Sequence, residues 1–380
     1  MVSITEHFSS SILPTEPIFA TEEHNVFEIA KERLLSLGKR FLVITGGSSA
    51  QRSGAWDDLA SFFKENDIEY AVFDQIEQNP SIDSVNAAIA AHKDHCPDYI
   101  VAIGGGSPID AAKAISIGLK GNLGTGMTKI GPTDMIPLVA VPTTAGTGTE
   151  ATPFSILTYH DFGTKLSIPE RVFPTISLMD ARYTKSLPAD VTMSTVLDAF
   201  SHNFEGYLGT NATPTSDATA LAGMRLFAET LPALRAVFTA EPSFDTRAKW
   251  MAASTLGGIT ITQTATSLPH GMGYVLTYSH GMPHGKANLA TYAPYMKMCM
   301  REERLAARVA EVLAMVGMDS IEQFDALLQE ICPGLKADIS AEQVEEYAKA
   351  MSTNAAKLKN HPGSASFADF VDCFSHVAKN

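Results

Sequence analysis

The sequence has few cysteines, and no two of them lie close together. Its 380 residues include only four, Cys96, Cys299, Cys332 and Cys373, and these form no Cys-x-x-Cys pair. This spacing argues against a thiolate zinc site and against a disulfide framework. We therefore expect the protein to work in a reducing compartment, the cytoplasm.

Long apolar runs and a leader-like beginning are also missing. No segment approaches the roughly eighteen uninterrupted apolar residues that a membrane-spanning helix needs. The first residues, MVSITEHFSSSILPTEP, lack a basic start followed by an apolar stretch. Secretion, membrane spanning and membrane partners are not expected.

Basic residues are fewer than acidic residues. Lys and Arg number 28 against 42 Asp and Glu, which gives a net charge of −14, and no dense basic cluster occurs. We therefore expect no nucleic-acid partner, because its phosphate backbone would have to be neutralised by such a cluster. An anionic nucleotide remains possible, since backbone N–H groups at a helix N-terminus can hold phosphate.

The length and the order of patterns predict two domains. Helical and strand-like segments alternate from about residue 26 to 142, beginning with a helix over 25–38 and a strand over 41–46. This alternation indicates parallel strands joined by helices. Beyond about residue 183, alanine-rich helical patterns dominate. We predict an α/β domain over residues 1–185 and an all-α domain over residues 186–380.

A glycine-rich loop separates one predicted strand from the next predicted helix. Gly104-Gly105-Gly106-Ser107-Pro108 follows the strand-like DYIVAI and precedes the helical IDAAKAIS. Glycines let the backbone approach a ligand, and the helix N-terminus favours phosphate, so the loop predicts a pyrophosphate site. The alternative is a tight turn that binds nothing, because the loop matches neither GxGxxG nor a P-loop.

A second loop rich in hydroxyls and glycines follows the strand-like PLVAV. It reads PTTAGTGTE, residues 142–150. Hydroxyl groups can donate to and accept from a ribose or a base. Two polar loops after neighbouring strands of an open α/β sheet are typical of nucleotide binding.

Candidate metal ligands gather in two stretches. Asp198 and His202 are four apart in a helical pattern and share a face, although such a pair often forms only a hydrogen bond. The stretch LPHGMGYVLTYSHGMPHGKAN, residues 268–288, contains His270, His280 and His284. One carboxylate with imidazoles from this stretch would suit Fe²⁺, Zn²⁺, Ni²⁺, Co²⁺ or Mn²⁺.

Four motifs in this order resemble the iron-containing (group III) alcohol dehydrogenase family, in its 1,3-propanediol and butanol dehydrogenase-like branch. They are GGGSPIDAAK, PTTAGTGTE, DAFSHNFEGY and HGMGY…PHGKAN. The resemblance implies a Rossmann-like dinucleotide-binding domain and a helical domain, the two-domain architecture of dehydroquinate synthase. It also implies a divalent metal, Fe²⁺ first, and we expect a homodimer.

Site residues are carried over from the family motifs position by position. The metal ligands correspond to Asp198, His202, His270 and His284, which leaves His280 as a neighbour. Catalysis is expected at the metal, with Tyr274 and His280 as candidate auxiliary residues. The pyrophosphate falls on Gly105, Gly106 and Ser107, with Asp110 nearby. The family's contacts with the adenine and ribose correspond to Thr143, Thr144 and Thr147, and its ribose-contacting lysine corresponds to Lys165.

Two departures from the family pattern bear on function. Many members have a histidine where this chain has Tyr274, and a phenol with a pKa near 10 is a poorer acid–base at neutral pH. Members that prefer NAD carry an aspartate at about Gly46. Here Gly46, Ser48 and Ser49 remove a carboxylate that would repel a 2′-phosphate, so NADP(H) is expected over NAD(H). The alternative is a glycine-rich turn with no role in cofactor choice.

These features predict an oxidoreductase that transfers hydride between nicotinamide and a small primary alcohol or diol, or the matching aldehyde. Three alternatives stay open. A zinc enzyme resembling glycerol-1-phosphate dehydrogenase or dehydroquinate synthase would need several basic residues near the metal, and the motifs next to the candidate ligands contain only Lys286. A metal-free maleylacetate reductase is disfavoured by the filled ligand positions. The last is a non-catalytic nucleotide- or metal-binding protein.

Overall fold

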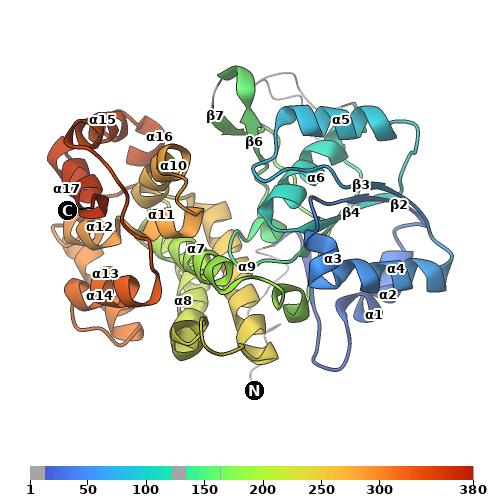
Figure 1. Ribbon diagram of the computed structural model, residues 1–380, viewed down its shortest axis with the longest axis horizontal. Coiled ribbons are helices and arrows are strands. Elements are labelled where there is room, and N and C mark those ends of the chain that lie inside the picture. Colours follow the sequence, from blue (N-terminus) through green and yellow to red (C-terminus); the bar gives the residue numbers. More distant parts are fainter. Residues whose placement is uncertain (1–12, 122–133, 163, 380) are drawn as a thin grey trace. The chain divides into compact units, whose positions relative to one another are not determined.

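The computed structural model describes residues 13–121, 134–162 and 164–379 of the chain. The N-terminal stretch 1–12, part of the segment judged not to be a leader, lies outside these residues. Two compact units can be distinguished. The first contains the chain up to Thr144 together with Gly148–Leu187, and the second contains Ala145–Thr147 and Pro188–Asn380. Figure 1 labels their helices and strands.

The first unit is built on a six-stranded sheet in which all neighbouring strands are parallel. The strand order is β1-β8-β5-β4-β2-β3. These strands are β1 Glu16–Phe19, β2 Arg40–Ile44, β3 Glu69–Phe73, β4 Tyr99–Gly104, β5 Leu138–Pro142 and β8 Ile176–Met179. A separate antiparallel pair joins β6 Ile156–Tyr159 to β7 Thr164–Ser167.

Helices cover both faces of this sheet, because successive strand residues point to opposite sides. Phe41 and Val43 of β2 belong to a core that includes Val26 of α1 and Leu59 of α4. Leu42 belongs to a second core, shared with α5 and α6. In Figure 1, α5 and α6 lie on one side of strands β2, β3 and β4, and α1, α2 and α4 lie on the other. The helices of this unit are α1 Val26–Ile29, α2 Lys31–Leu35, α3 Ser49–Ser53, α4 Ala55–Asn66, α5 Ile82–His92 and α6 Gly106–Gly118, with short 3₁₀ turns at Thr149–Ala151, His160–Phe162 and Ala181–Thr184.

The predicted alternation of helices and strands is confirmed, with two differences. The helix expected over 25–38 is divided into α1 and α2, which meet at Ala30. Strands β1, β6, β7 and β8 were not predicted. Each has only four residues, which is too short for an alternating pattern to stand out.

The second unit is helical, as predicted. Apart from an isolated bridge between Ala337 and Ala378, its described elements are all helices. None of the helices in the described parts of the chain is long and apolar enough to cross a membrane. The helices are α7 Ala189–Leu208, α8 Pro214–Arg235, α9 Phe244–Thr264, α10 Leu268–His280, α11 His284–Leu289, α12 Tyr292–Cys299, α13 Glu303–Met315, α14 Ile321–Ile331, α15 Ala341–Ser352, α16 Ala355–Leu358 and α17 Phe367–Val377.

Helices α7, α8 and α9 pack closely around the side chain of Asn203. Its Nδ2 donates to the carbonyl oxygens of Ala199 at 2.9 Å and Ala253 at 3.1 Å. A Cβ on Gly223 of α8 would lie 2.5 Å from this Nδ2, so only glycine allows the approach. The hydrogen bonds of the Asn203 amide and the small size of Gly223 therefore allow α7 to pack closely against α8 and α9.

Candidate metal centre and nucleotide-binding loops

Helix α7 carries Asp198 and His202 one turn apart on one face. Their side chains are 5% and 7% exposed, and His202 Nε2 lies 3.9 Å from Asp198 Oδ1. Four residues advance a helix by slightly more than one turn, so the two side chains point the same way. The pair lies inside the helical unit rather than on a solvated surface.

Helices α10 and α11 supply the other two candidate ligands. His270 lies in the first turn of α10, and His284 is the first residue of α11. A Cβ on Gly285 would lie 1.9 Å from the carbonyl oxygen of Ser194 on α7. Only glycine therefore lets α11 touch α7, and this contact brings the adjacent His284 to the level of Asp198.

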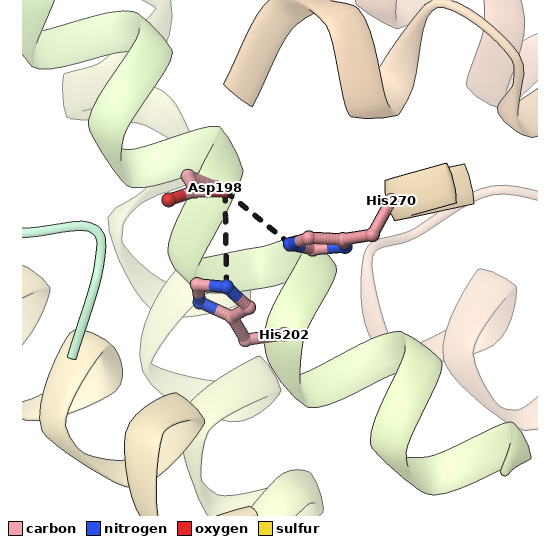
Figure 2. Close-up of side chains that lie close together, drawn as sticks. All are labelled: Asp198, His202 and His270. Carbon is pink, nitrogen blue, oxygen red and sulfur yellow. Dashed lines mark ion pairs between the residues drawn. The ribbon is translucent and has the colours of Figure 1, made fainter. Parts of the chain in front are cut away.

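Three imidazole nitrogens lie close to one carboxylate oxygen of Asp198. The Nε2 atoms of His270 and His284 each lie 3.8 Å from Asp198 Oδ1, beside the 3.9 Å of His202. Figure 2 shows Asp198, His202 and His270 directed toward one another, and their donor atoms all lie within 4.8 Å of one another. Metal–ligand bonds of about 2.1 Å in a tetrahedral site put ligand atoms about 3.4 Å apart. The observed spacing fits one ion.

The pKa shifts of the side chains in this cluster are also consistent with the binding of a cation. Burial lowers the pKa of His202 to about 3 and the pKa of His270 well below 6.5, so both imidazoles are neutral and offer a lone pair. Burial, then the charge of Glu205, raises the pKa of Asp198 well above 3.8. In the described residues, no lysine or arginine forms an ion pair with Asp198. A divalent ion would favour the ionised carboxylate and needs neutral imidazoles.

The amide of Asn288 contacts three of these four side chains. Its Nδ2 lies 3.1 Å from Asp198 Oδ1, 3.2 Å from His270 Nε2 and 3.4 Å from His284 Nε2. Asn288 is completely buried. Asn288 lies four residues after His284 on α11. If the sequence PHGKAN is assumed to be helical, this spacing places Asn288 on the same face as His284.

Tyr274 lies at the more exposed edge of the cluster. Its ring stacks on His284, with the centroids 5.3 Å apart and the planes 7° from parallel. Tyr274 is 46% exposed and the His284 side chain 34%, whereas the His270 side chain is 2% exposed. His284 and Tyr274 are therefore more accessible to solvent than His270. His280 lies apart at the end of α10, where its Nε2 is 3.1 Å from Tyr347 Oη.

The glycine-rich loop of the first unit ends β4 and begins α6. Gly104 has a φ of 150°, and a Cβ there would lie 2.6 Å from Pro108 Cγ, so glycine is required. Gly106 and Ser107 form the first turn of α6, and the N-cap residue Gly105 has no side chain to cap it. The backbone N–H groups of this first turn would favour the binding of a phosphate at the N-terminus of α6.

The hydroxyl-rich loop after β5 lies against the glycine-rich loop. The Thr143 N–H donates to the Gly104 carbonyl at 2.9 Å. A Cβ on Gly105 would lie 3.2 Å from the methyl carbon of Thr144. The structure thus brings these predicted nucleotide contacts together. Thr147 belongs to the short stretch Ala145–Thr147 that groups with the second unit.

Asp110 supports the chain that follows the hydroxyl-rich loop. Its Oδ1 accepts a short hydrogen bond from Thr149 Oγ1, and its Oδ2 accepts from the Ile156 N–H at 3.0 Å. The buried Lys113 Nζ lies 3.7 Å from Oδ1 and donates to the Phe154 carbonyl at 2.7 Å. Both carboxylate oxygens are engaged within the protein, and a contact of Asp110 with pyrophosphate stays a prediction.

Asn79 connects two predicted nucleotide contacts and was not found from the sequence. Its N–H donates to Ser107 Oγ at 3.1 Å, and its Oδ1 accepts from Lys165 Nζ at 2.7 Å. Asn79 has a φ of 61°, which asparagine tolerates better than most residues. The turn therefore brings Lys165 of β7 close to the glycine-rich loop.

The loop after β2 contains the residues predicted to select the nucleotide. Ser49 Oγ donates to the Gly46 carbonyl at 3.0 Å, and Ser48 is exposed at the start of α3. A Cβ on Gly46 would lie 2.0 Å from the Ile76 carbonyl oxygen, so an aspartate could not occupy that position without a shift. Gly47, with a φ of 56°, has nothing within 4 Å of an added Cβ.

Comparison with known families matches both halves of the chain to the same family. Residues 17–181 match the family described as iron-containing alcohol dehydrogenase. Residues 192–376 match the C-terminal part of the Fe-containing alcohol dehydrogenase family. The two matches together span most of the sequence.

Individual relatives agree with this assignment. The chain is 29% identical over 309 residues to the NADPH-dependent butanol dehydrogenase of Clostridium saccharobutylicum, covering 78% of each chain. It is 34% identical over 271 residues to the 1,3-propanediol dehydrogenase of Klebsiella pneumoniae, covering 70% of this chain and 69% of that one. The crystal structure of an iron-containing alcohol dehydrogenase from Thermotoga maritima matches with a TM-score of 0.83 and 35% identity, over 96% of this chain and 98% of that one.

Proposed function

The chain belongs to the iron-containing alcohol dehydrogenase family, and we propose that it transfers hydride between a nicotinamide nucleotide and a small primary alcohol or diol, or the matching aldehyde. In this proposal residues 1–185 bind the nucleotide and residues 186–380 bind the metal. The observation that carries the proposal is the donor set, in which three imidazole nitrogens lie 3.8–3.9 Å from Asp198 Oδ1.

We assign a divalent ion to Asp198, His202, His270 and His284. The family favours Fe²⁺, and the donor set also accepts Zn²⁺, Ni²⁺, Co²⁺ or Mn²⁺. When bound, such an ion supplies Lewis acidity toward the substrate oxygen. The protein contributes neutral imidazoles and one carboxylate in surroundings that exclude water on the side of α7. Because His284 and Tyr274 are the more exposed members, we assign the substrate to their side.

We assign the nucleotide phosphates to Gly105, Gly106 and Ser107, whose N–H groups and helix dipole favour anions. Asn79 supports this assignment because it holds Lys165, the proposed ribose contact, beside Ser107. NADP(H) is the proposed nucleotide, because no acidic side chain occurs in the loop Gly46–Ser49 to repel a 2′-phosphate.

Reduction of an aldehyde also requires a proton at the substrate oxygen. We assign Tyr274 to orienting the substrate, since its ring is stacked on His284. We assign the proton to ribose hydroxyls and water. His280, whose Nε2 contacts Tyr347, takes no step in this route.

The test is NADPH-dependent reduction of a series of small aldehydes by the metal-loaded protein, with His284→Ala compared to His280→Ala. Both histidines lie in the same short stretch, but only His284 belongs to the donor set. We expect His284→Ala to lose metal and at least about a hundredfold in kcat/KM, since a donor to a metal site is removed. His280→Ala is the matched control and should retain both.

Equal activity of the two variants would contradict the ligand assignment. No NADPH or NADH oxidation by the metal-loaded wild type with any aldehyde would favour the non-catalytic alternative. The proposal includes a homodimer, which light scattering during size-exclusion chromatography would test through the molar mass.

A further inference from the structure

Glu205 is a buried carboxylate directed at the candidate ligand His270. Its side chain is fully buried, and Oε1 lies 2.7 Å from His270 Nδ1. Oε2 accepts from the backbone N–H of Ser267 at 2.8 Å and from that of His270 at 3.4 Å. Tyr292 donates its hydroxyl to Oε1 at 3.3 Å. One carboxylate therefore holds both the imidazole of His270 and the backbone that leads into it.

The contact at Nδ1 determines which nitrogen of His270 is free. An ionised carboxylate can only accept, so with Glu205 ionised Nδ1 carries the hydrogen and Nε2 keeps its lone pair. Nε2 is the atom that lies 3.8 Å from Asp198 Oδ1. The lone pair thus lies on the nitrogen that is close to Asp198.

The same carboxylate stabilises the start of α10. Ser267, the N-cap residue of α10, provides no side-chain cap. Glu205 takes that place by accepting from two N–H groups of the first turn, where a negative charge also favours the helix dipole. Glu205 therefore also stabilises the first turn of α10, in which His270 lies.

Glu205 shares a face of α7 with two candidate ligands. It follows Asp198 by seven residues and His202 by three, which places all three side chains along one side of the helix. The three residues therefore form a continuous row from the ligand positions to the support of a third ligand.

Lys357 offsets the charge of this buried carboxylate. Burial raises the pKa of Glu205 to about 7, and the ammonium of Lys357 is the largest influence in the opposite direction. Lys357 Nζ donates to Thr266 Oγ1 at 2.5 Å and lies 5.3 Å from the ring centroid of Tyr274. Glu205 is thus part of a charge-compensated buried group.

We propose that Glu205 is a positioning residue of the metal centre, which fixes His270 in the tautomer and orientation that metal binding requires. This inference rests on the metal-binding function proposed above. Removing such a partner of a metal-binding histidine typically weakens metal affinity about 10–100-fold. A role limited to capping α10 would lower the stability of the fold and leave the affinity of the folded protein for metal unchanged.

The experiment compares the Zn²⁺ dissociation constants of the metal-free wild type, Glu205→Gln and Tyr292→Phe, measured by competition with a chelating dye. We expect Glu205→Gln to bind Zn²⁺ about 10–100-fold more weakly. Tyr292→Phe is the matched control, because it removes a hydrogen bond to the same Oε1 and leaves His270 bonded. It should bind within about twofold of the wild type. A Glu205→Gln protein with unchanged Zn²⁺ affinity and only a lower free energy of unfolding would overturn the inference.

A second measurement applies even where Glu205→Gln fails to fold. In metal-free wild type with ¹⁵N-labelled histidine, the His270 signals, assigned by their loss in His270→Ala, should show a protonated Nδ1 and an unprotonated Nε2. The opposite tautomer would contradict the inference. Failure of the proposed function would be distinguishable, because the wild type would then bind no Zn²⁺ at all.

Discussion

At the scale of single residues, Gly47 offers a direct test of nucleotide preference. It is exposed, and an added Cβ would meet nothing within 4 Å. Its φ of 56° is one that aspartate and asparagine adopt more readily than most residues. We predict that Gly47→Asp weakens NADPH binding relative to NADH by about tenfold, because the carboxylate repels the 2′-phosphate. Fluorescence titration with each nucleotide measures the ratio.

Gly47→Asn is the control for this change, since the asparagine has the same shape without the charge. It should leave the ratio of NADPH to NADH affinity as in the wild type. A ratio that stays unchanged in Gly47→Asp, or that shifts equally in Gly47→Asn, would speak against the loop after β2 as the site of the 2′-phosphate.

The sequence could predict candidate ligands but not the residues that support them. Asp198, His202, His270 and His284 are residue types with an obvious affinity for metal, and family motifs mark them. Glu205 and Asn288 act through contacts made between helices far apart in the sequence, such as the 2.7 Å contact of Glu205 with His270. Their spacing on α7 and α11 was visible, but a glutamate or asparagine on a helix is usually solvated. Only packing shows them to be buried.

At the scale of elements, the close approach of α11 to α7 is the contact that should matter most for the site. A Cβ on Gly285 would lie 1.9 Å from the Ser194 carbonyl oxygen and 2.9 Å from the Asp198 nitrogen. Gly285→Ala must therefore push α11 away and shift the adjacent His284. We predict metal binding at least about tenfold weaker, with a loss of about 1–3 kcal/mol in the free energy of unfolding. Dye competition and urea unfolding of the metal-free protein measure the two effects.

Gly317→Ala provides a control that lowers the stability of the fold without a clash between α7 and α11. Gly317 follows α13 with a φ of 74° and open space around it, so alanine there strains the backbone without touching α7 or α11. It should lower the free energy of unfolding and leave metal affinity as in the wild type. If both variants lost metal affinity equally, the effect would come from general destabilisation rather than from the α7–α11 contact.

Element prediction succeeded where segments were long and strongly patterned. The long helices α4, α5 and α6 all lie in the region where alternating helices and strands were predicted. The helix expected over 25–38 is instead interrupted at Ala30. Val26 of α1 and Leu34 of α2 both lie in the core, although they belong to different helices. Strand β8, four buried residues long, pairs with β1 and β5. A segment so short is recognised as a strand only through its partners in the sheet.

At the scale of the whole molecule, the proposed nucleotide and metal sites lie in two different compact units of one chain. The first has a parallel sheet whose strands β4 and β5 end in polar loops, the usual place for a nucleotide in such sheets. The second holds all four candidate ligands on α7, α10 and α11. The order of patterns along the sequence anticipated this division, because repeated strand–helix alternation and uninterrupted helices differ over many residues. The stretch Ala145–Thr147, which groups with the helical unit, was not anticipated.

The central claim is that Asp198, His202, His270 and His284 hold a divalent ion on which alcohol dehydrogenase activity depends. The measurement that tests it most directly is the metal content of protein purified without added metal or chelator, followed through chelation and reloading, with NADPH-dependent aldehyde reduction assayed at each step. We predict about one divalent ion per chain, with ion and activity lost together on chelation and restored together by Fe²⁺ under anaerobic conditions. Activity that persists in protein exhaustively freed of metal would contradict the claim.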